Sequence, residues 1–172
     1  MISSAKVHKF EQSLKELLPY KNQIQSIMGH ILESGETFNS PLIEDRDVKS
    51  VCIVAYGSDD GLCGAYNMNV FKHLLLTISE LRDKYGRDIR ITICPVGRKI
   101  AKACNRLAGE SMVSVKYVDG VDSKMPGKKV NEFTHHLKDM FLKGEVDLVL
   151  SVYTNFISMA RQRLKTEQML PV

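Results

Sequence analysis

The chain has 172 residues, of which 44% are hydrophobic, and its formal net charge is +4. This length suits one buried core better than two, so we expect one domain with an appendage. Because charges of both signs are mixed along the chain and their sum is small, neither a disordered tail nor a nucleic-acid groove is indicated. No apolar run approaches the roughly twenty residues of a membrane-spanning helix, so we expect any membrane association to be indirect.

Residues 5–32 are predicted to form a long helix, because apolar residues recur in steps of three and four. This stripe consists of Val7, Phe10, Leu14, Leu17, Ile24, Met28 and Ile31. A period of about 3.5 residues is typical of a coiled-coil seam, which needs a partner helix. An amphipathic helix that packs on its own domain fits the pattern equally well, and a kink at Pro19 suits either interpretation. We assign residues 1–34 to this coiled-coil arm, with Leu14 and Ile24 as candidate partner contacts.

After a connecting loop at residues 33–49, strands and helices are expected to alternate. The expected strands lie at 49–56, at 89–96 (alternating), at 112–118, at 146–153 (buried) and, as an edge strand, within 155–168. A helix between the first two strands is marked by Phe71, Leu74, Ile78 and Leu81 and closed by Gly86, and a short helix ends at Gly109. The last expected helix follows Pro126 and has Val130, Phe133, Leu137, Met140 and Phe141 on one face. This alternation is typical of a Rossmann-like, mostly parallel sheet flanked by helices. We assign residues 48–172 to this α/β domain.

The loop from Gly57 to Gly64 (GSDDGLCG) lies between a predicted strand and a predicted helix start, where glycine-rich turns can cradle a phosphate. Its spacing matches neither of the usual nucleotide-binding fingerprints, and the adjacent Asp59 and Asp60 would repel a phosphate. A tight structural turn is therefore the better interpretation, and a nucleotide site is the alternative.

No other residues form a pattern that indicates catalysis, a cofactor or a metal. Cys63 lies near a predicted helix start, which favours a thiolate, but no local motif places a base beside it. The adjacent His135 and His136 point in different directions on a helix and cannot chelate one metal ion. The basic stretch at 161–165 is either a solvated face or a partner surface. The cysteines, at Cys52, Cys63, Cys94 and Cys104, match no zinc or redox spacing, so we expect reduced thiols.

Three ordered segments carry a more specific pattern. The first segment is Met1-Ile2-Ser3-Ser4-Ala5-Lys6. The second follows a hydrophobic strand and comprises Ser58-Asp59, Gly61-Leu62-Cys63-Gly64 and Asn67-Met68-Asn69. The third runs from Gln162 to Leu170-Pro171. In this order they resemble the γ subunit of rotary F-type ATP synthases, whose glycine-rich segment reads S-D-R/K-G-L-C-G-G/A-x-N-x-N. The resemblance covers essentially the whole chain.

The resemblance implies a non-catalytic rotor subunit of the central stalk, without a cofactor. Such a subunit couples ion-driven rotation of the membrane c-ring to ATP synthesis or hydrolysis in the ring of α and β subunits. The implied partners are the α, β and ε subunits and the c-ring, and the implied location is peripheral, on the cytoplasmic side of a bacterial inner membrane. Because the family continues into a long C-terminal helix, we expect the seam partner to lie beyond Val172 and the chain to be a fragment or a shortened homologue.

One position departs from the family pattern. Asp60 stands where the family has a basic residue near an acidic stretch of a β subunit, and like charges there would weaken that contact. Lys72 matches a second family lysine, so Asp60 and Lys72 are the candidate partner contacts on the domain. The rival hypothesis is a stand-alone Rossmann-like module that binds a nucleotide or phosphorylated ligand at the loop from Gly57 to Gly64.

Overall fold

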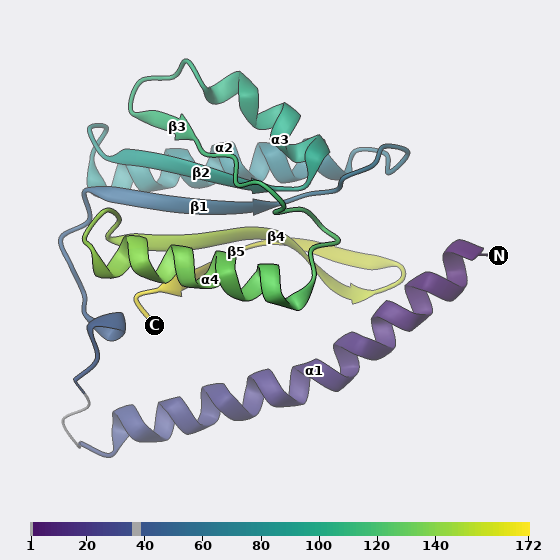
Figure 1. Cartoon of the computed structure of the whole chain (residues 1–172), viewed down its shortest axis with the longest axis horizontal. Coiled ribbons are helices and arrows are strands. Elements are labelled where there is room, and N and C mark those ends of the chain that lie inside the picture. Colours follow the sequence, from purple (N-terminus) through teal and green to yellow (C-terminus); the bar gives the residue numbers. More distant parts are fainter. Residues whose placement is uncertain (1, 36–38) are drawn as a thin grey trace. The chain divides into compact units, whose positions relative to one another are not determined.

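The computed structural model describes residues 2–35 and 39–172, and the chain divides into two units, Met1–Ser40 and Pro41–Val172. The helices are α1 (Ile2–Glu33), α2 (Tyr66–Tyr85), α3 (Arg98–Cys104) and α4 (Gly127–Leu142), and the strands are β1 (Ser50–Tyr56), β2 (Arg90–Val96), β3 (Val113–Val115), β4 (Leu148–Ser158) and β5 (Arg161–Leu170) (Figure 1).

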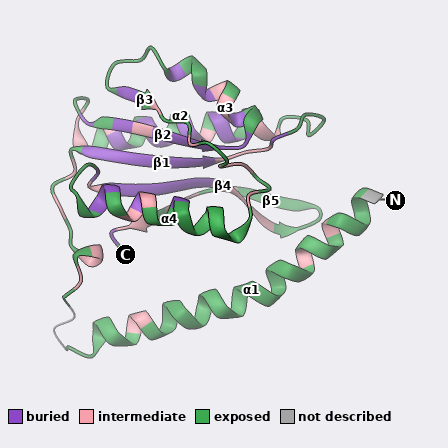
Figure 2. Cartoon of the chain, viewed as in Figure 1, coloured by how far each residue is buried: buried purple, intermediate pink, exposed green. Residues whose placement is uncertain are grey.

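The first unit consists of the long helix α1. The helix is continuous through Pro19, and it curves along its length (Figure 1). No side chain from residue 3 to residue 33 is buried, and Figure 2 shows α1 exposed along almost its whole length. The prediction of a long N-terminal helix is therefore confirmed.

The second unit is built on a five-stranded sheet in the order β3-β2-β1-β4-β5. β1 pairs in parallel with β2 and β4, and β2 pairs in parallel with β3, whereas β5 returns antiparallel to β4. This arrangement confirms the prediction of a Rossmann-like, mostly parallel sheet flanked by helices.

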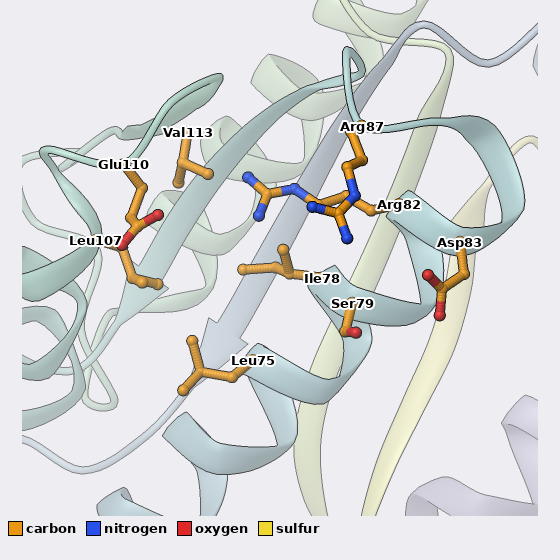
Figure 3. A pocket seen from close by; sticks show the side chains of 9 residues that line it. All are labelled: Leu75, Ile78, Ser79, Arg82, Asp83, Arg87, Leu107, Glu110 and Val113. Atoms are coloured by element: carbon orange, nitrogen blue, oxygen red, sulfur yellow. The ribbon is translucent and has the colours of Figure 1, made fainter.

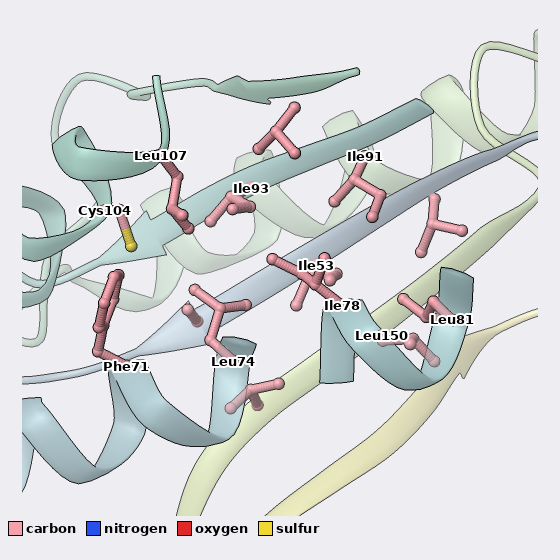
Figure 4. Close-up of a cluster of buried hydrophobic side chains, with 14 of the residues drawn as sticks. Ile53, Phe71, Leu74, Ile78, Leu81, Ile91, Ile93, Cys104, Leu107 and Leu150 are labelled. Carbon is pink, nitrogen blue, oxygen red and sulfur yellow. The ribbon is translucent and has the colours of Figure 1, made fainter. Parts of the chain in front are cut away.

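Each face of the sheet is covered by helices. On β1, Val51, Ile53 and Ala55 join the cluster beneath α2 and α3 (Figure 4), whereas Cys52 and Val54 join the cluster beneath α4. A strand buried on both faces needs an uninterrupted apolar run, which SVCIVAY supplies. Each large apolar side chain buried in this way contributes about 1.5–3 kcal/mol.

Several details of the strands and of α4 differ from the prediction. β3 pairs over only three residues, because the chain leaves the sheet edge soon after Val115. The predicted edge strand within residues 155–168 is observed as β5, which lies at the edge of the sheet, but residues 155–158 belong to β4 and the turn at 159–160 precedes β5. β2 is buried on both faces rather than alternating, and Val130 is exposed rather than on the buried face of α4.

Candidate partner-contact surfaces

The loop from Gly57 to Gly64 follows β1, and glycine is required there for close packing. A Cβ atom on Gly57 would lie 2.4 Å from the Cβ atom of Ile100 and 2.6 Å from Oδ1 of Asn67, and one on Gly97 would lie 2.9 Å from the carbonyl oxygen of Gly57. The two strand-to-helix loops therefore touch backbone to backbone. A packing role for Gly57 and Gly97 favours the structural turn.

Asp59 joins this loop to two other segments, and its side chain is only 6% exposed. Its Oδ1 accepts a hydrogen bond of 3.2 Å from the backbone N–H of Arg98, the first residue of α3. Its Oδ2 accepts hydrogen bonds from the backbone N–H of Ser123, at 3.2 Å, and from the Ser123 hydroxyl. The hydrogen bond from that hydroxyl, together with those from the two backbone groups, holds the pKa of Asp59 below its ordinary value. The carboxylate of Asp59 thus occupies the start of α3.

Asp60 is exposed and lies between two cations. Its Oδ1 is 3.1 Å from Nη2 of Arg98, and its Oδ2 is 3.6 Å from Nζ of Lys124. All three side chains are more than 70% exposed, so each ion pair contributes about 1 kcal/mol or less. Two cations, at the start of α3 and in the segment before α4, thus flank one exposed carboxylate, and we call this surface the Asp60 cluster (Asp60, Arg98 and Lys124).

Lys72 lies in the first half of α2 and is exposed. Within the described ranges, no hydrogen bond or ion pair joins it to another residue, so its ammonium group is available to a partner. The next residue turns inward: Nε2 of His73 lies 2.9 Å from Oγ1 of Thr166, which connects α2 to β5. Because residues 57–65 form a loop rather than helix, Asp60 and Lys72 do not lie along one helix.

Leu14 and Ile24 are 40% and 55% exposed on α1. Neighbouring apolar residues that the predicted seam omitted are also exposed and widen the stripe: Leu18, Ile27 and Leu32. A stripe wider than a strict a/d seam covers more of a partner's surface. We call the set Phe10, Leu14, Leu17, Leu18, Ile24, Ile27, Ile31 and Leu32 the α1 stripe.

The described residues offer little for bond-breaking chemistry. No group of three or more histidine, cysteine, aspartate or glutamate residues among them is placed to hold a metal ion, and the four cysteines are free thiols. Cys63 contacts Asn67 and Ser58, which are not bases at neutral pH, and burial raises the pKa of Cys104 to about 11. No helix in the same part of the chain is long and apolar enough to cross a membrane.

Sequence reasoning did not find the side chains that surround the two aspartates. Arg98, Ser123 and Lys124 lie far along the chain from Asp59 and Asp60, and nothing local in the sequence pairs them. The available signal was the parallel topology, because the loops after neighbouring parallel strands meet at one edge of the sheet.

The geometry thus defines a Rossmann-like α/β domain with a helical arm, whose exposed features are suited to contacts with other proteins. The chain matches the ATP synthase family model over residues 1–172. It therefore belongs to the ATP synthase family, and curated proteins that are similar to it include γ chains.

The ATP synthase γ chain of Bacteroides thetaiotaomicron is 38% identical over 172 residues, covering 100% of this chain and 56% of that protein. The γ chain of Legionella pneumophila is 26% identical over 175 residues, covering 100% and 58% respectively. The chain thus spans little more than half the length of these relatives. A chain of the Tetrahymena thermophila mitochondrial ATP synthase central stalk and c-ring assembly has a TM-score of 0.70 at 17% identity, with 99% of this chain and 70% of that one covered. At that identity the likeness shows the fold alone.

Proposed function

We propose that this chain is the first helix and the globular domain of a central-stalk rotor subunit in a rotary ATP synthase. In this role it transmits torque between an ion-driven c-ring and a catalytic ring of α and β subunits. The observation that carries the proposal is the match to the ATP synthase family over all 172 residues, together with the unburied α1 stripe. Residues 1–34 serve as the shaft helix, and residues 48–172 serve as the domain.

The stripe and the domain have different tasks under this proposal. The α1 stripe packs against a second helix to form a stiff shaft, because a helix with this much exposed apolar surface is stabilised by burial against a partner. The domain suits rigid coupling, because a close-packed sheet transmits strain instead of absorbing it. The proposed partners of the whole subunit are the α, β and ε subunits and the c-ring.

The Asp60 cluster and Lys72 are proposed to face an acidic surface of a β subunit. Arg98 and Lys124 supply positive charge although Asp60 does not, and Lys72 adds a free ammonium group. The location that follows from these partners is peripheral, on the cytoplasmic side of a bacterial inner membrane, and attachment is through the complex. Catalysis then belongs to the β subunits, and this chain needs no cofactor.

The alternative, a module that binds a nucleotide at the loop from Gly57 to Gly64, is not favoured by the geometry, because the two loops are in backbone contact and Asp59 occupies the start of α3.

Purification through an affinity tag inserted at the exposed turn after Ser158 tests the proposal. The tagged protein is expected to copurify from solubilised membranes with α, β, ε and c subunits, in fewer copies than α or β. Native mass spectrometry measures this composition. Recovery of the chain without these subunits would reject the proposal, as would calorimetric binding of ATP, ADP or NAD that Gly57→Ala abolishes.

A further inference from the structure

A cavity of about 270 Å³ lies between the second half of α2 and the segment that leads into β3 (Figure 3). Its apolar lining includes Ile78 from α2, Leu107, and Val113 at the start of β3. Two arginines, Arg82 and Arg87, also line it, and both are labelled in Figure 3. The residues that line the cavity include none of the Asp60 cluster, and the proposed rotor function does not use the cavity.

Arg82 is held in place but incompletely paired. Its Nη2 donates a hydrogen bond of 3.1 Å to the carbonyl oxygen of Ser111, which restrains the guanidinium group. Its Nε is buried and has no hydrogen-bond partner among the described residues. Buried donors of this kind are rare in folded proteins, because each loses its hydration without replacement. Because this Nε has almost no accessible surface, a ligand in the cavity meets other atoms of the Arg82 side chain, and the Nε–H serves as a reporter beside the site.

Arg87 reaches the same cavity because the chain turns sharply after α2. Gly86 adopts a positive φ of 103°, which ends the helix, and its N–H donates to the carbonyl oxygen of Arg82 at 2.9 Å. Two acids, Asp83 and Glu110, also line the cavity. Neither is within ion-pair distance of Arg82 or Arg87 in the described structure, so both arginines can bind a further anion.

We propose that this cavity binds a carboxylate carried on a short aliphatic stem. Two guanidinium groups supply several N–H donors that match the two oxygens of a carboxylate, and the apolar lining accepts the stem. Glu110 disfavours a doubly charged phosphate more than a singly charged carboxylate, because repulsion grows with ligand charge. The carboxylate belongs either to a free small acid or to a glutamate side chain of another protein.

The buried Nε–H of Arg82 gives a direct readout by NMR. In ¹H–¹⁵N spectra of the full chain, the Arg82 Nε–H signal is assigned as the one missing in Arg82→Lys. Titration with butyrate, with a blocked glutamate peptide and with inorganic phosphate should move this signal for the two carboxylates, and phosphate should bind at least several-fold more weakly than butyrate.

Three variants separate binding from folding. Arg87→Gln removes a side chain that makes no described hydrogen bond or ion pair. This variant should weaken the binding of butyrate by about tenfold or more, while the temperature of thermal unfolding is unchanged. Glu110→Gln should tighten binding several-fold, and Arg106→Gln, which changes an exposed arginine outside the cavity, should leave it unaltered. Much tighter binding of the peptide than of butyrate identifies a protein ligand, and equal binding identifies a free acid. An unmoved Arg82 signal, equal affinities for Arg87→Gln and Arg106→Gln, or phosphate binding as tight as butyrate would overturn the proposal.

Discussion

Replacing Asp59 with asparagine should destabilise the domain by roughly 3 kcal/mol. The carboxylate accepts three hydrogen bonds at a buried junction of the loop after β1, the start of α3 and the segment around Ser123. Hydrogen bonds to a charged acceptor contribute about 1.5–3 kcal/mol each. Asparagine keeps one acceptor oxygen but turns an NH₂ group toward the remaining donors, so one to two of these interactions are lost. For a domain of this size, that loss lowers Tm by about 10 °C.

The pH dependence gives the sharper test, because the pKa of Asp59 is lowered in the folded state from its ordinary value of 3.8. A carboxyl with a depressed folded pKa stabilises the fold above its unfolded pKa and loses that contribution as the pH falls through the folded pKa. In urea unfolding, the gap between the original protein and Asp59→Asn should stay constant from pH 7 to about 5 and shrink below about pH 4. Asp60→Asn, at the neighbouring exposed acid, is the matched control and should cost about 1 kcal/mol or less. Equal losses for the two variants, or a gap that does not shrink in acid, would refute this account of the junction.

Four further predictions concern packing, charge and function. Gly57→Ala should cost about 2 kcal/mol in urea unfolding, because its Cβ would overlap packed atoms. Leu14→Lys with Ile24→Lys should abolish any concentration-dependent self-association of the chain in analytical ultracentrifugation, because the apolar stripe is interrupted. In the assembled synthase, Asp60→Arg should tighten the attachment of this subunit at low salt by about 1 kcal/mol or less, since Arg98 and Lys124 are released from pairing, and the gain should fade as salt rises. The purified chain should hydrolyse no ATP in a phosphate-release assay.

Each of these predictions has its own contrary outcome. Unchanged stability of Gly57→Ala would mean that the two loops separate freely. Gln12→Lys with Ser26→Lys, two positions off the stripe, should leave self-association unaltered, and a dimer that survives the stripe variant as well would reject the stripe as its cause. If Asp60→Arg and the original protein attach to the synthase equally strongly at every salt concentration, the Asp60 cluster does not meet an acidic partner. ATP turnover that is lost on mutation of this chain would refute its non-catalytic role.

Much of the fold follows from local patterns in the sequence. The run SVCIVAY predicts a strand buried on both faces, and the three- and four-residue spacing of Phe71, Leu74 and Ile78 predicts α2. Both are observed, because burial on a two-faced sheet and on one face of a helix impose these periods. The short β3 was not predictable, because the same apolar residues suit a longer strand and only the path of the chain at the sheet edge ends the pairing.

The candidate surfaces were predictable only in part. Leu14 and Ile24 follow from a helical period, and both are exposed on α1, but their role as partner contacts stays a prediction. The surroundings of Asp60 depend on Arg98 and Lys124, which tertiary structure brings together from separate loops. The cavity at Arg82 depends in the same way on contacts between α2 and the chain before β3, and no sequence spacing encodes them.

Single-molecule rotation tests the central claim most directly. In the complete ATP synthase that contains this chain, Ala160→Cys in a Cys63→Ser background provides one exposed thiol in the turn after β4, because the other three cysteines are buried. A gold particle attached there, with the catalytic ring fixed to a surface, should rotate in one direction when ATP is added. A particle that stays still while the same complexes hydrolyse ATP would contradict the assignment of this chain to the rotor.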